Sequence, residues 1–411
     1  MEVRAETKPS MLRRCRDWDY RRPCIYQITL VLADRRSQAL GRLVIPGASA
    51  PGTGQLGASA PGTGQLATGE PAAAAGSYIS LTEAGEAVKR EFWDMGRHHP
   101  EIRPLELAVM PDHCHFIIRV TRRMDKPLGN AIGGFKSGSS KAAIGQPGLW
   151  SEGFQDTILF HDGQLEAMFN YLRDNPRRLA VKRLCPDLFR VTRDLRLPFR
   201  AYGGRGSVPE AAASGHFTAI GNHFLLDAPD VLQVQVSRRD FAYKRQPKPG
   251  GGLKIERDER GRPVTAMATP DFIEKRDMLL GAALKGAVLL SPCISDGERE
   301  IARLAFEEGH KVVTLSNKGF SPLYKPGGRL FEMTANGNLL MLAPINWPYV
   351  PCDKPITRID ACILNRIAQW LAGPGATEIA YRGVTPLEID RLAGAVVAAQ
   401  LRGAQAGANV V

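Results

Sequence analysis

The segment Leu105-Glu-Leu-Ala-Val-Met-Pro-Asp-His-Cys-His-Phe-Ile-Ile-Arg-Val120 contains two runs of strand-forming residues with a turn signal between them. Residues 105–110 and 115–120 are rich in apolar and β-branched side chains, and Pro111-Asp112 favours a change of direction. We therefore expect two adjacent strands. Because side chains alternate between the faces of a strand, His113 and His115 share one face, and the opposite face carries Cys114, Phe116, Ile118 and Val120.

The flanking sequence predicts the rest of an α+β unit. Residues 26–33 are rich in β-formers and predict an early strand. Leu81, Ala84, Val88, Phe92 and Met95 have helical spacing, with Thr82 as the expected cap. Further helices are expected over residues 130–144 and 163–184, and further strands between 145 and 160. This order indicates a sandwich with the helices on one face of an antiparallel sheet.

The remaining sequence divides into an insert, a linker and a second unit. A decapeptide at residues 47–56 is repeated at 57–66, and we expect a flexible insert over 47–76 because this composition buries little apolar surface. The predicted domains are 1–195, a linker and irregular region at 196–270, and an α/β domain at 271–411. In the last, strands at 286–291 and 311–315 flank a helix at 296–308, and a strand at 339–343 and a helix at 357–371 follow.

Composition limits the classes of protein that this chain fits. Its 411 residues exceed one ordinary domain, and 54 Lys and Arg against 42 Asp and Glu give a net charge of +12. This charge favours a polyanionic partner such as nucleic acid, although a basic soluble protein without such a partner shares it. The seven cysteines form neither a CxxC pair nor a dense framework. With no secretory leader or membrane span, we expect a cytoplasmic protein.

The histidine pair and a tyrosine further along the chain are the candidate chemical groups. Two imidazoles on one strand face can bind one cation, but paired strand histidines are also found as structural or exposed residues. Tyr171 and Asn175 stand at i and i+4, so they share a helix face. A tyrosine near a metal-bound phosphate can act as a nucleophile, and an asparagine oxygen can bind the metal; packing in an amphipathic core is the alternative for Tyr171.

Several stretches of the chain together resemble the HUH-type single-tyrosine transposases of insertion sequences, most closely the REP-associated tyrosine transposases. The resemblance covers about residues 20–190 and agrees in order and approximate spacing. Its stretches are Tyr26-Gln-Ile-Thr29, Val109-Met-Pro-Asp-His-Cys-His115, Phe135-Lys-Ser137, Leu149-Trp-Ser-Glu-Gly-Phe-Gln-Asp156 and Tyr171-Leu-Arg-Asp-Asn-Pro176.

The resemblance implies a fold, a metal site and a reaction. The fold would be ferredoxin-like (RRM-like), with His113 and His115 binding Mg²⁺ or Mn²⁺ and Asn175 in the position of a third ligand. Tyr171 would attack single-stranded or hairpin DNA and leave a 5′-phosphotyrosine and a free 3′-hydroxyl. Family members usually have a bulky hydrophobic residue where this chain has Cys114. A homodimer with a shared active site is one open alternative, and a DNA-binding protein that has lost turnover is another.

Basic residues on two of the predicted helices are candidate DNA contacts, because Lys and Arg neutralise backbone phosphates. A solvated helix face is the other interpretation of such residues. The candidates are Lys136, Lys141, Arg173, Arg177 and Arg178.

The second half of the chain carries one weaker motif. In Val288-Leu-Leu-Ser-Pro-Cys-Ile-Ser-Asp-Gly-Glu298 a strand runs through a small-residue turn into a helix, an arrangement that can offer backbone N–H groups to a phosphate. With the helix that follows, it looks like the Rossmann-like superfamily of DNA-processing protein A and the LOG nucleotide-processing enzymes, although the glycine-rich signature is not intact. A nucleotide-binding enzyme targeted by the N-terminal domain and a structural α/β accessory domain both remain open.

Overall fold

The computed structural model divides the chain into two compact units, one ending at Leu184 and one beginning at Cys185. The described residues are 15, 18–46, 74–145, 147–160, 163–200, 213–247, 252–321, 323–350, 355–379, 381 and 383–399. Most of the expected insert at 47–76 therefore lies outside them, and of its last three residues Ala74 is fully buried.

A four-stranded antiparallel sheet in the order β4-β5-β1-β6 forms the centre of the first unit. The two strands predicted around Pro111-Asp112 are present and pair with each other, so His113 lies opposite Met110 and His115 lies opposite Ala108. The strands span Cys24–Val31 (β1), Ile102–Met110 (β4), His113–Val120 (β5) and Gln155–Leu159 (β6). A separate two-stranded sheet pairs β2 (Gly41–Val44) with β3 (Tyr78–Leu81).

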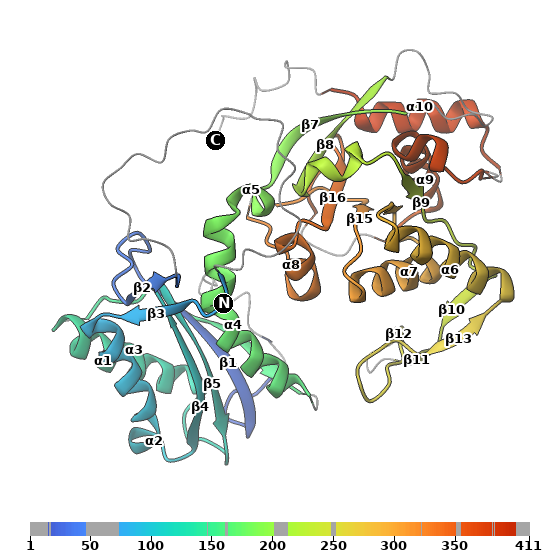
Figure 1. The fold of residues 1–411 in the computed structure, drawn as a ribbon. Helices are drawn as coiled ribbons and strands as arrows, with labels where there is room; N and C mark the ends of the chain where they lie inside the picture. The colour runs from blue at the N-terminus through green and yellow to red at the C-terminus, as the bar shows by residue number, and fades with distance from the viewer. Residues whose placement is uncertain are drawn as a thin grey trace, which may run out of the picture. The chain divides into compact units, whose positions relative to one another are not determined.

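Two long helices cover the apolar face of this sheet, as Figure 1 shows. They are α1 (Glu83–Trp93) and α3 (Leu128–Ile144). Phe92 of α1 and Phe135 of α3 pack in one core with Phe116 of β5. The predicted cap is confirmed, because the Thr82 side chain accepts a hydrogen bond from the Gly85 amide. The predicted helix is interrupted after Trp93, and a short helix, α2 (Met95–His98), follows.

The third helix, α4 (Gln164–Leu184), lies on the opposite side of the sheet (Figure 1). The expectation that all helices cover one face is therefore wrong for α4. The physical reason is visible in the strand pattern: Ile117 of β5 is fully buried although it shares the histidine face, and Gln27 of β1 on that face is 8% exposed. A face with such residues requires cover. The unit is thus mixed α+β with helices on both faces.

A six-stranded sheet in the order β7-β8-β16-β15-β14-β9 forms the second unit. β16, β15, β14 and β9 run parallel, and β8 is antiparallel to both β16 and β7. The expected strands near 286–291, 311–315 and 339–343 are all present. The six strands are Thr192–Pro198 (β7), Ser214–Gly221 (β8), Val231–Gln233 (β9), Val288–Ser291 (β14), Val312–Leu315 (β15) and Leu339–Pro344 (β16).

Helices cover both faces of this second sheet. On one face, α6 (Pro270–Leu284) and α7 (Asp296–Glu307) pack on Leu289 and Val312. On the other, α9 (Arg358–Ala372) packs on Leu290 and Val313, and α10 (Pro386–Val397) packs on α9. The remaining elements are α5 (Pro186–Phe189), η4 (His223–Asp227), β10 (Phe241–Tyr243), β11 (Arg245–Pro247), β12 (Leu253–Ile255), β13 (Thr265–Ala268), α8 (Gly328–Ala335) and η5 (Gly373–Gly375).

The segment at 196–270, expected to be a linker and irregular region, differs from that expectation. It supplies β8 and β9 to the six-stranded sheet, and Phe217 and Ala219 of β8 are fully buried in the core of the unit. The glycines and prolines of this segment favour an irregular structure, and the apolar run of β8 is short. β8 is stabilised by its pairing with β16, which lies far away in the sequence.

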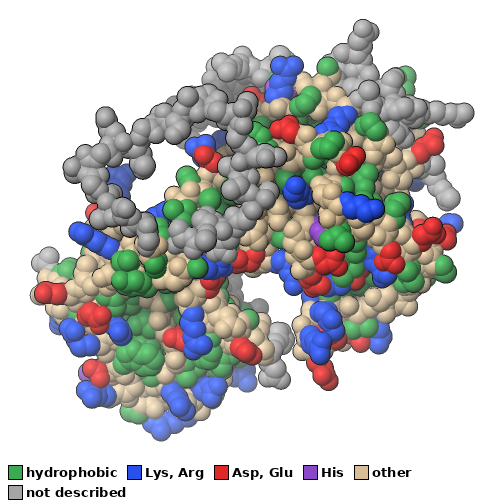
Figure 2. All heavy atoms as spheres, in the orientation of Figure 1, with side chains coloured by type: hydrophobic (Ala, Val, Ile, Leu, Met, Phe, Trp, Pro, Cys, Tyr) green, Lys and Arg blue, Asp and Glu red, His purple; other side chains and the backbone are tan. Residues whose placement is uncertain are grey.

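Two surface properties bear on partners. None of the helices in the described part of the chain has the length and apolar character needed to cross a membrane. On the face drawn in Figure 2, Lys and Arg side chains are interspersed with Asp and Glu over both units. The positive net charge therefore does not gather into one basic patch on that face.

Candidate functional site

The histidine pair of β5 lies on the sheet face away from the apolar core, as its spacing predicts. Cys114 between the two histidines is fully buried in the core, whereas His113 and His115 are partly exposed on the other face. Their ring centroids are 4.8 Å apart. Because both rings lie on the same face of β5 and close together, they can contact one ligand.

His113 is oriented by a carboxylate. Its Nδ1 atom lies 2.6 Å from Asp112 Oδ1, and the other oxygen of Asp112 accepts from Arg35 Nε at 2.8 Å. Burial would raise the pKa of Asp112, but the contacts with His113 and Arg35 outweigh it and hold the pKa well below its ordinary value. A carboxylate that accepts from Nδ1 leaves Nε2 as the free nitrogen of the ring, which is the arrangement common at metal-binding histidines.

His115 is oriented by two polar side chains of the neighbouring strand β1. Its Nδ1 atom lies 2.8 Å from Thr29 Oγ1 and 3.3 Å from Gln27 Nε2. Burial, with His113 nearby, lowers the pKa of His115 to about 3, so the ring is neutral at physiological pH. Sequence reasoning assigned no role to Gln27 or Thr29, although the period of two along 26–29 would have placed both on the histidine face.

Tyr171 reaches this face from α4. Its ring centroid lies 6.0 Å from that of His115 at an interplanar angle of 66°, and the side chain is 39% exposed. Asn175, one turn further along α4, is 8% exposed, and its Nδ2 atom has no hydrogen-bond partner. The structure thus brings the predicted nucleophile to the histidine pair, and Asn175 shares its helix.

The donor set can be compared with the needs of a divalent cation. Among the described residues, neither histidine Nε2 atom has a hydrogen-bond partner, and the Nδ2 atom of Asn175 has none either. Two imidazoles and an amide oxygen suit a cation such as Mn²⁺ or Mg²⁺ that keeps waters or substrate oxygens as further ligands. No cluster of three or more His, Cys, Asp or Glu in the described part of the chain is arranged to hold a metal. The ligand roles therefore stay predictions.

The predicted DNA contacts do not form one surface. Lys136 and Lys141 belong to α3, on the side of the sheet opposite α4. Lys136 donates from Nζ to the carbonyls of Ser151 and Gly153, and these two hydrogen bonds stabilise the loop that carries them. Burial lowers the pKa of Lys136. Lys141 is exposed.

The three arginines of α4 also have partners within the unit. Arg173 lies 2.8 Å from Glu106, and Arg177 donates to both oxygens of Asp174. Arg178 is 8% exposed, and its guanidinium lies 5.5 Å from the centre of the Tyr171 ring. The role of these residues as DNA contacts stays a prediction.

The lowered pKa of His115 predicts a pH dependence of stability. Its pKa is about 3 in the folded chain against an ordinary 6.5, so below pH 6.5 the unfolded chain binds a proton that the folded chain does not. Stability of the first unit is therefore expected to fall as the pH drops below 6.5, by up to about 1.4 kcal/mol per pH unit from this residue.

The measurement is hydrogen exchange of β5 peptides with EDTA present, in wild type and His115→Gln, from pH 7.5 to 4.5. The amides of β5 are expected to exchange more slowly in wild type than in His115→Gln, and this difference should decrease towards low pH. A difference that stays constant over this range would contradict a lowered pKa of His115 in the folded chain.

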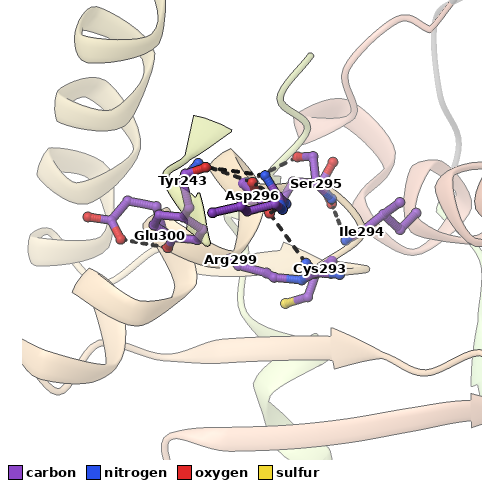
Figure 3. Close-up of polar contacts among 9 residues, drawn as sticks. Tyr243, Cys293, Ile294, Ser295, Asp296, Arg299 and Glu300 are labelled. Atoms are coloured by element: carbon purple, nitrogen blue, oxygen red, sulfur yellow. Dashed lines mark hydrogen bonds and ion pairs between the residues drawn. The ribbon is translucent and has the colours of Figure 1, made fainter. Parts of the chain in front are cut away.

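Side chains of the second unit accept from several backbone amides of the turn between β14 and α7. The Glu298 carboxylate accepts from Ile294 N at 2.7 Å and from Ser295 N at 3.4 Å, and Ser291 Oγ accepts from Cys293 N. Figure 3 shows the turn, with Arg299 directed to Cys293. The chain's own carboxylate thus occupies the place that the sequence offered to a phosphate.

Removing this carboxylate is expected to destabilise the second unit. Glu298→Ala leaves the amides of Ile294, Ser295 and Val236 without their acceptor in a buried turn, which costs about 1–3 kcal/mol. Glu298→Gln keeps one acceptor oxygen and should lose less. Urea unfolding of both variants checks this, and an alanine variant as stable as wild type would show that the turn draws nothing from the carboxylate.

Comparisons with known proteins do not assign the chain to a family. No protein family matches the chain, and no curated protein matches it. Among solved structures, a REP-associated tyrosine transposase bound to a REP hairpin is similar, with 16% identity and a TM-score of 0.27. That similarity covers 40% of this chain and 72% of the transposase chain. A similarity of this size supports no conclusion about activity.

Proposed function

We propose that the first unit is a metal-dependent endonuclease and strand transferase for single-stranded or hairpin DNA, a transposase-type activity. The observation that carries the proposal is the approach of Tyr171 on α4 to His115 on β5, with 6.0 Å between ring centroids. The two residues are distant in sequence. In each histidine Nδ1 contacts a neighbouring side chain, so Nε2 is the nitrogen that could bind a metal.

The arrangement of the elements supports the fold side of the proposal. Numbered along the chain, the strands β1, β4, β5 and β6 lie in the order β4-β5-β1-β6, with α1 and α3 as the two connecting helices on one face. This is the order expected of a ferredoxin-like unit. The four parallel strands of the second unit, linked by helices, support a Rossmann-like arrangement there.

In the proposed reaction, Tyr171 supplies the nucleophile. Its Oη forms a bond to the scissile phosphorus as the bond to the 3′ oxygen breaks, the phenol proton passes to solvent, and the leaving oxygen takes up a proton. The products are a 5′-phosphotyrosine and a free 3′-hydroxyl, and the covalent bond keeps the energy for rejoining. His113, His115 and Asn175 would hold Mg²⁺ or Mn²⁺, which when bound supplies charge neutralisation at the phosphate.

The test is covalent capture. Full-length protein is incubated with labelled single-stranded hairpin DNA from its own genomic flanks, with Mn²⁺, Mg²⁺ or EDTA, and separated under denaturing conditions. We expect a protein–DNA adduct with metal and none with EDTA, and mass spectrometry should place the nucleotide on Tyr171. Binding without an adduct in any metal would contradict catalysis on these substrates and favour a DNA-binding protein without turnover. Light scattering of the native full-length protein, which measures its mass in solution, tests the homodimer alternative.

A cavity in the second unit favours nucleotide binding as a second candidate function. It has a volume of about 570 Å³ and lies beside β9, β14 and the beginning of α9. Its lining includes Arg238, Arg358, Glu298, Asn365 and Tyr381. The two arginines suit an anionic ligand. Calorimetry of full-length protein with nucleoside monophosphates, beside Arg358→Ala, tests it, and no heat of binding at millimolar nucleotide would eliminate it.

A further inference from the structure

Arg178 stands out among the arginines of α4 because it is buried. Its side chain is 10% exposed, whereas a guanidinium normally stays in solvent unless a specific contact repays the loss of hydration. Its guanidinium lies 5.5 Å from the centre of the Tyr171 ring, within the range of a cation–π contact. The buried cation is therefore placed against the candidate nucleophile.

The Tyr171 ring is only partly enclosed by the protein. The side chain is 39% exposed, and an exposed tyrosine on a helix exchanges between rotamers. Two ring contacts restrict it here: the His115 ring at 6.0 Å and the Arg178 guanidinium at 5.5 Å. A ring with two such neighbours presents its hydroxyl in a narrower range of directions.

The neighbouring arginine has a different task. Arg177 donates to both oxygens of Asp174, at 2.5 and 2.9 Å, whereas the nearest approach of Arg178 to the same carboxylate is 3.8 Å. Asp174 is thus mainly the partner of Arg177. The two arginines are adjacent in sequence and equal in charge, but only the guanidinium of Arg178 lies over the tyrosine ring.

We propose that Arg178 is a positioning residue that holds the Tyr171 ring beside His115, and that it does so before DNA binds. The inference rests on the proposed function for its catalytic meaning, but the ring contact itself exists without DNA. A displaced nucleophile loses rate at a given DNA occupancy, because an error of about 1 Å can cost about 100-fold. A residue that only neutralised a DNA phosphate would instead weaken binding and lower its salt dependence.

Arg178→Gln is compared with Arg177→Gln in full-length protein by two measurements. The first is the rate of adduct formation at saturating hairpin DNA with Mn²⁺, alongside the Kd for the same DNA. We expect Arg178→Gln to lose about 10- to 100-fold in rate while Kd stays within about threefold. Arg177→Gln, at a predicted phosphate contact, should instead show its loss in Kd and in the salt dependence of Kd. Arg178→Lys, which keeps the charge but not the planar stacking, should fall between wild type and Arg178→Gln.

The second measurement needs neither metal nor DNA. Fluorotyrosine incorporated at position 171 reports the ring environment by ¹⁹F NMR in EDTA, and the resonance is expected to shift or broaden in Arg178→Gln but not in Arg177→Gln. An unchanged resonance, or a weakened Kd with the rate at saturation intact, overturns the positioning role. If wild type forms no adduct, the proposed function fails, and the ¹⁹F result alone then decides the positioning role. A misfolded Arg178→Gln leaves that decision to Arg178→Lys.

Discussion

Tyr171→Phe is expected to abolish covalent capture of DNA while DNA binding and folding persist. Phenylalanine keeps the ring that contacts His115 and Arg178 and removes only the hydroxyl oxygen that would bond to phosphorus. Because the proposed intermediate is an ester of that oxygen, no adduct can form without it. The measurement is the denaturing-gel assay at saturating DNA, with the Kd determined separately.

The matched control for this variant is Tyr78→Phe. Tyr78 is also an exposed tyrosine of the first unit, 53% exposed, and it belongs to β3 outside the four-stranded sheet. We expect full adduct formation from the control. If Tyr171→Phe still forms an adduct, another residue is the nucleophile, and the assignment of Tyr171 is wrong.

The largest effect on stability is expected from Arg366→Ala in the second unit. Arg366 is 2% exposed, its Nε lies 2.7 Å from Asp390 Oδ1, and its NH1 group donates to Gln369. Burial raises the pKa of Asp390, while the Arg366 charge opposes that rise. Truncating the arginine strands the carboxylate between α9 and α10, so the free energy of unfolding should fall by about 3–5 kcal/mol. Urea unfolding measures it.

A double variant separates the lost partner from the lost volume. In Arg366→Met with Asp390→Leu both charges are absent and most of the packing is kept, so most of the lost stability is expected to return. A double variant as unstable as Arg366→Ala would show that the ion pair itself, or the contact of Arg366 with Tyr381, carries the stability.

Local sequence patterns predicted much of the site because the direction of a side chain on a strand or helix depends only on nearby residues. Alternation along β5 places His113 and His115 on one face and Cys114 in the core, as the structure has it. Helical spacing likewise placed Tyr171 and Asn175 on one helix, and Thr82 was identified as a cap from its type and position. These features depend on backbone geometry within a few residues, so the sequence carries them directly.

Pairing between distant segments was beyond such reasoning. The sequence did not show that α4 covers the face opposite α1 and α3, or that Lys136 fastens a loop. It also did not show that β8, in a stretch rich in glycine and proline, pairs with β16. Each of these outcomes depends on which partner buries an apolar face or satisfies a polar group, and that partner lies far away in the chain.

The sequence by itself therefore determined the strand pair around Pro111-Asp112, the Thr82 cap and the chemical types present: two imidazoles on one strand face, and a tyrosine and an amide on one helix. Only the tertiary structure decided that Tyr171 lies against His115, that Thr29 and Asp112 orient the imidazoles, and that Glu298 fills its own turn. The physical reason is that periodicity sets the direction of a side chain along its own element, whereas burial and hydrogen bonding between elements choose its neighbours.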